Sequence, residues 1–171
     1  MVGRARGDRQ NIKNELEKIE YFTSNKKTLK IKDLLKLTNL AENYNVSELI
    51  DACLSKNKKK TINILNENNY SLEDCILIIR TFLIKAKRLV RLSKEFGVTK
   101  NLDATISSFK PPIFWKEKDV IKQQVKSWSY KEAENLIYQV SAVELLIKKY
   151  SNSSINILSD FIIEKSSPIN N

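Results

Sequence analysis

The sequence predicts an all-α fold, and three observations support this prediction. Only three Gly and three Pro interrupt the 171 residues, whereas β-sandwiches and barrels need frequent turns. Leu, Ile, Lys, Glu and Asn dominate the chain, which favours long helices. Apolar residues make up 42% of the chain and recur mostly at helical spacing, so such helices can bury a real core.

Residues 1 to 41 are expected to form two short helices. GDRQNIKNELEKIEYF carries apolar residues at helical spacing behind a possible N-cap, Asp8, and IKDLLKL offers the second helix. Two such helices alone would leave apolar side chains exposed, so we expect instability or self-association in this region. The side chains concerned are Leu16, Ile19, Leu34 and Leu35.

A helical hairpin and one long helix are expected next. The hairpin consists of NVSELIDACLSKN and KKKTINILNEN, whose apolar residues recur at helical spacing. They are Leu49, Ile50, Cys53 and Leu54, then Ile62 and Leu65. SLED resembles a capping box and opens a helix from Leu72 to about Phe96, for which Gly97 is the natural C-cap. The predicted apolar stripe of this helix is Cys75, Ile76, Ile79, Phe82, Leu83, Ala86 and Val90.

Three or four further helices are expected in the last third of the chain. A short one lies around Leu102 to Ile106 and cannot continue through Pro111-Pro112. The next runs from about Phe114 to Ser127, and SYKE provides a capping box for the one after it. The apolar positions of that helix are Ala133, Leu136, Ile137, Val140, Val143 and Ile147, and those of the last helix are Ile155, Leu158 and Ile162.

Residue types exclude several kinds of active site. The chain has no histidine, so Ser-His and Cys-His nucleophiles and ordinary histidine metal sites are excluded. It has no GxxxxGK[ST] motif that could bind nucleotide phosphates in the P-loop manner. Cys53 and Cys75 have no CxxC spacing and are expected to be buried thiols. The sequence therefore predicts no cofactor, no metal site and no convergent set of acid, base and nucleophile.

The charge suggests a polyanionic partner. The formal net charge is +10 at pH 7, and lysines and arginines near phosphates gain affinity by releasing counterions. A composition rich in Lys, Asn and Ile can also arise without selection for DNA binding. The first residues, MVGRARGDRQ, lack an apolar signal-peptide core, and charges interrupt every long apolar stretch. We therefore expect a cytoplasmic protein that makes no use of a membrane.

A basic stripe is predicted on the long helix. Intervals of seven, four and three residues place its four cations on one helical face. They are Arg80, Lys87, Arg91 and Lys94, flanked by Lys85 and Arg88. Such a face can track a phosphate backbone or meet an acidic subunit, but it is also what any solvated amphipathic helix shows.

An aromatic cluster brackets the lysine-rich helix that follows the two prolines. It comprises Phe109, Phe114, Trp115, Trp128 and Tyr130. Exposed aromatic rings beside cations are what single-stranded nucleic acid stacks on. The alternative is that Trp128 and one of Phe114 or Trp115 belong to the core, and for Trp128 we expect the core.

Three stretches resemble the delta subunit of bacterial DNA polymerase III, particularly its alphaproteobacterial form. RARGDRQNIKNELEKIEYF is similar to a late lid segment, and NYNVSELIDACLSKNKKKTINILNE is similar to the start of the collar domain. In FKPPIFWKEKDVIKQQVKSWSYKEAENLIYQVSAVELLIKKY the most specific features are the PP-aromatic turn, the W-S helix start and the late E-L-x-x-K. The resemblance covers nearly the whole chain.

The resemblance implies a domain organisation and a set of partners. Residues 1–41 would be the end of an AAA+ lid, 42–165 a helical collar that assembles with other clamp-loader subunits, and 166–171 a disordered tail. The implied partners are the ATP-binding gamma/tau type subunits, delta-prime and primer-template DNA. The sliding clamp would be bound only through an N-terminal domain that this chain lacks. Delta subunits do not hydrolyse ATP, so the chain would be no enzyme on its own, although it would belong to the DNA-directed DNA polymerase III holoenzyme.

The resemblance also suggests which residues lie near DNA. In loaders of this type the delta collar is close to the primer terminus, and by local alignment Phe114 or Trp115 and Tyr150 occupy positions from which a ring can stack on a base. The alternative is that these rings pack between helices. An alternative function is a stand-alone basic helical module that binds nucleic acid through the stripe from Arg80 to Lys94.

Overall fold

The structure is a computed structural model that describes residues 40–68 and 70–167, together with positions 13, 16, 17, 20, 21, 23 and 24. The chain divides into two compact units, Met1–Asn45 and Val46–Asn171. In the first unit, positions 13, 16, 17, 20 and 21 are helical, as predicted, and so is Thr23, which follows the predicted helix. Leu16 is half exposed and Tyr21 is exposed. Ile19, Leu34 and Leu35 lie outside the described residues.

The described residues are all-α, which confirms the predicted fold class. The helices are α3 (Leu40–Leu54), α4 (Lys58–Glu67), α5 (Leu72–Thr99), α6 (Leu102–Ser108), α7 (Lys118–Ser127), α8 (Tyr130–Lys149) and α9 (Ser154–Ser166), with 3-10 segments η1 (Trp115–Glu117) and η2 (Ser151–Ser153). The second unit begins at Val46, inside α3, a few residues after the boundary predicted at 41/42. Helix α9 includes Ser166, where the tail was expected to start, and 168–171 lie outside the described residues.

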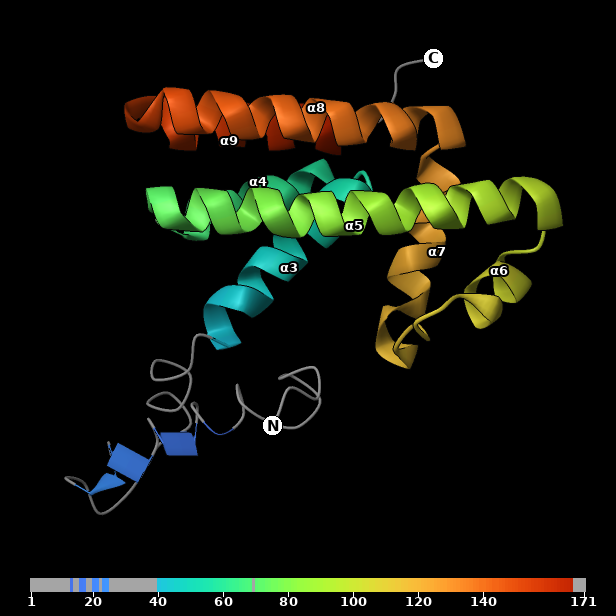
Figure 1. Ribbon diagram of the computed structural model, residues 1–171, viewed down its shortest axis with the longest axis horizontal. Helices are drawn as coiled ribbons and strands as arrows, with labels where there is room; N and C mark the ends of the chain where they lie inside the picture. Colours follow the sequence, from blue (N-terminus) through green and yellow to red (C-terminus); the bar gives the residue numbers. More distant parts are fainter. Residues whose placement is uncertain are drawn as a thin grey trace. The chain divides into compact units, whose positions relative to one another are not determined.

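Helix α5 is the centre of the second unit (Figure 1). Helix α8 packs along α5 in the opposite direction, and α9 returns beside α8. Helices α6 and α7 contact α5 on another side, below it in the view of Figure 1. A helix of 28 residues spans about 42 Å at 1.5 Å per residue, so α5 can hold groups that are far apart in one rigid frame.

Local capping explains where these helices begin. Ser71 with Asp74 and Ser129 with Glu132 form the two predicted capping boxes, in which side chain and backbone bond reciprocally. Asn57 and Asn101 accept hydrogen bonds from the backbone N–H groups at the starts of α4 and α6, where neither cap was predicted.

The buried face of α5 differs from the predicted stripe. Ile76, Leu83 and Val90 are only partly buried. The residues of α5 that are buried are instead Cys75, Ile78, Ile79, Phe82, Lys85, Ala86, Leu89, Leu92 and Ser93. The reason is that α5 is covered from several sides, by α8 and α9 as well as α6 and α7, so its buried arc is wider than the single stripe of a surface helix.

Smaller differences occur in the neighbouring helices. Ile64 is buried, whereas the predicted Ile62 and Leu65 are partly buried. In α9, Ile155 is 47% exposed, although it was predicted on the apolar stripe. Phe161 takes its place in the core, with its ring centroid 5.6 Å from that of Phe82. Both cysteines are buried and free, as predicted.

The C-terminal end of α5 also differs from the prediction. The helix passes through Gly97 to Thr99 and is capped by Lys100, which has a left-handed backbone (φ 54°) and donates its N–H to the carbonyl of Phe96. The hydroxyl of Thr99, the last residue of α5, lies 2.8 Å from the hydroxyl of Thr105 in the following helix. Gly97 is therefore part of the helix, and the residue that adopts the left-handed cap conformation is Lys100.

We predict that Lys100→Gly stabilises the protein by about 1 kcal/mol, because a side chain with a Cβ disfavours the left-handed conformation that glycine adopts freely. Urea unfolding followed by circular dichroism measures the change. Lys94→Gly, in the same helix but with helical geometry, is the matched control and should destabilise by about 1 kcal/mol. A destabilised Lys100→Gly protein would contradict the prediction.

A buried polar network connects three helices. Lys85 was predicted to flank the exposed stripe, but it is buried. Its Nζ atom lies 2.5 Å from Oδ2 of Asp51 in α3 and donates to the carbonyl and hydroxyl of Ser47. Oδ1 of Asp51 accepts a hydrogen bond of 3.0 Å from Gln124 in α7. Desolvation lowers the pKa of Lys85 and the Asp51 charge partly restores it.

Trp128 is buried, which confirms the prediction that it belongs to the core. It also bonds to the end of α3. Its indole Nε1–H donates to the carbonyl of Leu54 at 2.8 Å, and Gln123 donates to the carbonyl of Ser55. These are carbonyls that a helix end leaves without partners. The ammonium of Lys56 lies 3.6 Å from the Trp128 ring centroid.

Candidate nucleic-acid interface

The outer face of α5 carries the predicted basic stripe. Arg80, Lys87, Arg91 and Lys94 are all exposed. Within the part of the chain that the structure describes, Arg80, Lys87 and Lys94 have no salt bridge or side-chain hydrogen bond. Three cations at seven-residue intervals are therefore free to meet an anion, with successive charges about 10 Å apart along the helix.

Arg91 differs from the other three members of the stripe. Its guanidinium carbon lies 4.7 Å from the ring centroid of Phe109, and Nη2 donates to the carbonyl of Lys110 at 3.1 Å. One turn earlier, Nη1 of Arg88 contacts Oε2 of Glu117 at 3.0 Å. The segment from 109 to 117 is thus held against the flank of α5.

Phe114 and Trp115 are the exposed point of this segment, and together we call them the aromatic corner. Phe114 is 54% and Trp115 67% exposed, and their ring centroids are 5.8 Å apart. The ammonium of Lys116 lies 5.2 Å from the Trp115 ring. The alternative that one of the two belongs to the core is therefore wrong.

The buried aromatic residue of the segment is Phe109, which the sequence placed in the cluster available for stacking. It is 6% exposed and lies under Arg91. Pro111 and Pro112 lie between it and the aromatic corner, so no helix forms here. The chain returns to helical geometry only at η1, where Phe114 is the N-cap.

Tyr150 lies elsewhere. It is the C-cap of α8, 49% exposed, with the ammonium of Lys149 5.2 Å from its ring. Figure 1 shows that α8 ends beside the start of α5, whereas the aromatic corner is tied to α5 at Arg88. The start of α5 and Arg88 are roughly 20 Å apart along the helix axis. The structure therefore does not bring Tyr150 to the aromatic corner.

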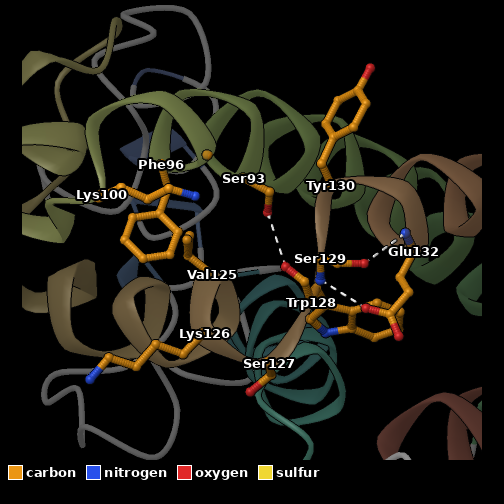
Figure 2. Close-up of a pocket in the computed structure, with 11 residues that line it drawn as sticks. Ser93, Phe96, Lys100, Val125, Lys126, Ser127, Trp128, Ser129, Tyr130 and Glu132 are labelled. Carbon is orange, nitrogen blue, oxygen red and sulfur yellow. Dashed lines mark hydrogen bonds between the residues drawn. The ribbon is translucent and has the colours of Figure 1, made fainter.

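A surface hollow of about 550 Å³ lies between the end of α5 and the α7–α8 junction. Figure 2 shows that its polar groups bond to one another: Ser93 donates to the carbonyl of Trp128, and Ser129 and Glu132 cap each other. Hydrogen bonds from the hydroxyl and the backbone of Ser129 hold the pKa of Glu132 below its usual value. A carboxylate with a lowered pKa is a poor general acid.

The described residues contain no group of three or more Cys, Asp or Glu side chains placed to hold a metal ion. Their helices are also too short or too polar to cross a bilayer.

Sequence reasoning missed how the stripe and the aromatic cluster are related. It identified both, but as separate features, and it did not predict that Arg88 and Arg91 would bond to the segment from 109 to 117. The available signal was Pro111-Pro112, which marks a turn that must pack on something. The partner of that turn cannot be read from a one-dimensional pattern.

Comparison with known proteins gives one relative. The chain is 26% identical over 158 residues to a protein of Aquifex aeolicus (strain VF5) described as "Probable DNA polymerase III subunit delta". The match covers 90% of this chain but 44% of the relative, so the chain spans less than half the length of the protein it resembles. No protein-family model and no solved structure matches the chain. The described residues are thus helical, and the chain has a distant similarity to a DNA polymerase III delta subunit.

Proposed function

We propose that this chain is part of a DNA polymerase III delta subunit and acts as a non-catalytic component of the clamp loader in the cytoplasm. Its second unit would be the collar, which assembles with the ATP-binding and delta-prime subunits near primer-template DNA, and residues 1–41 would be the end of the AAA+ lid. Support comes from the similarity over 90% of the chain and from the all-helical structure.

The observation that carries the DNA-proximal part of the proposal is the combination of free cations and exposed rings. The stripe offers unpaired positive charge on α5, and Arg88 and Arg91 tie the aromatic corner to the same helix. Cations give affinity for any phosphate backbone, and rings stack on any base. Such a surface fits a primer-template junction, where duplex and single strand are both present, without reading sequence.

Assembly is tested by co-purifying the chain with the gamma/tau type and delta-prime subunits of the same organism, followed by size exclusion at moderate salt. We expect a stoichiometric complex. A folded chain that elutes alone, while the other subunits assemble with each other, would contradict the clamp-loader proposal.

The DNA contact is tested in the assembled complex with a primer-template junction labelled at the primer end. Trp115→Ala should weaken binding by about 1 to 3 kcal/mol, the usual stacking contribution of one aromatic residue. Tyr138→Ala is the matched control, because Tyr138 is 70% exposed on α8, away from the aromatic corner. Equal affinities of the Trp115→Ala and Tyr138→Ala complexes would exclude stacking on Trp115.

The second candidate function is a stand-alone nucleic-acid-binding module, which the unpaired Arg80, Lys87 and Lys94 favour. This function predicts direct binding by the chain alone, with affinity that falls steeply as salt rises. A collar should instead bind DNA weakly until its partners are present. Fluorescence anisotropy at 50 and 200 mM salt, with and without the partner subunits, separates the two.

A further inference from the structure

We infer that the cations of α5 have two different tasks: Arg88 and Arg91 are positioning residues that hold the aromatic corner, whereas Arg80, Lys87 and Lys94 contact phosphate. This inference rests on the proposed function, since it assigns roles within the same surface. It changes the interpretation of the basic stripe, whose four members look equivalent in the sequence.

The two arginines attach to residues close to the aromatic corner. Arg91 donates to the carbonyl of Lys110, four residues before Phe114. Arg88 contacts the carboxylate of Glu117, two residues after Trp115. The bonds therefore fasten the segment on both sides of the aromatic corner, and both start from adjacent turns of one rigid helix.

The guanidinium of Arg91 makes two contacts with the segment. Its guanidinium lies over the buried ring of Phe109 while it donates to the carbonyl of Lys110. Arginine suits this task because its planar group can stack on a ring and donate in its own plane at the same time. A phosphate that drew the guanidinium of Arg91 away from the segment would break both contacts, whereas Lys87 and Lys94 have no such contacts to lose.

A segment that presents rings gains from such bonds. Residues 110 to 113 lie outside the helices, and ordering a loose loop when it binds subtracts from affinity. A segment already fastened at Lys110 and Glu117 presents Phe114 and Trp115 in one arrangement. The arginines thus favour stacking without touching the nucleic acid.

The two tasks predict different responses to salt. Each phosphate contact that is removed lowers the slope of log affinity against log salt by about one. We expect Lys87→Gln and Lys94→Gln to reduce this slope on a primer-template junction. We expect Arg91→Gln to lower affinity several-fold with an unchanged slope, and to have almost no further effect once Trp115→Ala is present. A slope reduced by Arg91→Gln, or additive effects of the two substitutions, would overturn the inference.

A second measurement needs no DNA. The chain has two tryptophans, so incorporating 5-fluorotryptophan gives one fluorine resonance from exposed Trp115 and one from buried Trp128. Arg91→Gln should narrow the Trp115 resonance and move it toward its unfolded position, while the Trp128 resonance stays in place and shows that the fold is intact. Arg80→Gln is the matched control and should leave both resonances unchanged.

The two measurements separate failure of the inference from failure of the proposed function. An unchanged Trp115 resonance in Arg91→Gln would overturn the positioning role, whatever the DNA assay shows. If the resonance responds while Trp115→Ala leaves DNA affinity unchanged, the positioning role stands and the proposed stacking function fails.

Discussion

Replacing Trp128 by alanine is expected to destabilise the protein by about 4 kcal/mol, within the range for buried aromatic residues. Trp128 is 6% exposed, and its indole N–H satisfies the carbonyl of Leu54 at the end of α3. Truncation would remove the packed ring, leave a cavity and orphan that carbonyl. Urea unfolding followed by circular dichroism gives the free energy of unfolding.

The matched control is Trp115→Ala, which removes the same side chain from an exposed position. Its effect should stay within about 0.5 kcal/mol. Similar losses for the two variants would mean that Trp128 does not have the structural role assigned to it. The contrast also separates stability from binding, because only Trp115→Ala is expected to weaken DNA binding in a folded protein.

Replacing Lys85 by methionine is expected to cost about 3 kcal/mol. Methionine keeps most of the apolar part of the lysine side chain but removes the ammonium, which leaves Asp51 with an uncompensated charge. The Asp51 side chain is 23% exposed and remains bonded to Gln124. Adding Asp51→Leu should recover most of the loss, since replacing both partners of a buried ion pair by apolar residues is often neutral. If the double variant is no more stable than Lys85→Met, the loss does not come from the unpaired charge.

The same pair predicts a pH dependence with a definite sign. Burial lowers the pKa of Lys85 from its ordinary 10.5, so between the lowered value and 10.5 the unfolded chain binds more protons than the folded one at this site. Stability contributed by Lys85 therefore rises with pH across that window. The deficit of Lys85→Met relative to the original protein should widen as the pH rises toward 10.5, and a constant deficit would contradict the assigned cause.

Much of the fold follows from local patterns. The capping boxes at Ser71 and Ser129 and the break at Pro111-Pro112 act within a few residues, so helix starts and stops could be read from the sequence. The exposed line from Arg80 to Lys94 also follows from helical periodicity alone. These predictions succeed because the interactions that decide them connect residues that are close in the sequence.

One error has the opposite origin. Lys85 was expected at the surface, but Asp51 in another helix provides a buried partner. The environment of Lys85 therefore depends on a segment that only folding brings near. The end of α5 was wrong for a local reason, because the left-handed cap conformation falls on Lys100 and Gly97 stays helical.

The candidate interface shows the same division. By itself, the sequence determined the helical class, the basic stripe and the presence of aromatic residues around the two prolines, because composition and periodicity specify them. Only the tertiary structure decided that Phe109 is buried, that Phe114 and Trp115 are exposed, and that Tyr150 lies far from both. It also decided which arginines are engaged by backbone and carboxylate oxygens. The physical reason is that exposure and pairing depend on which faces of different helices meet, and no single helix contains that information.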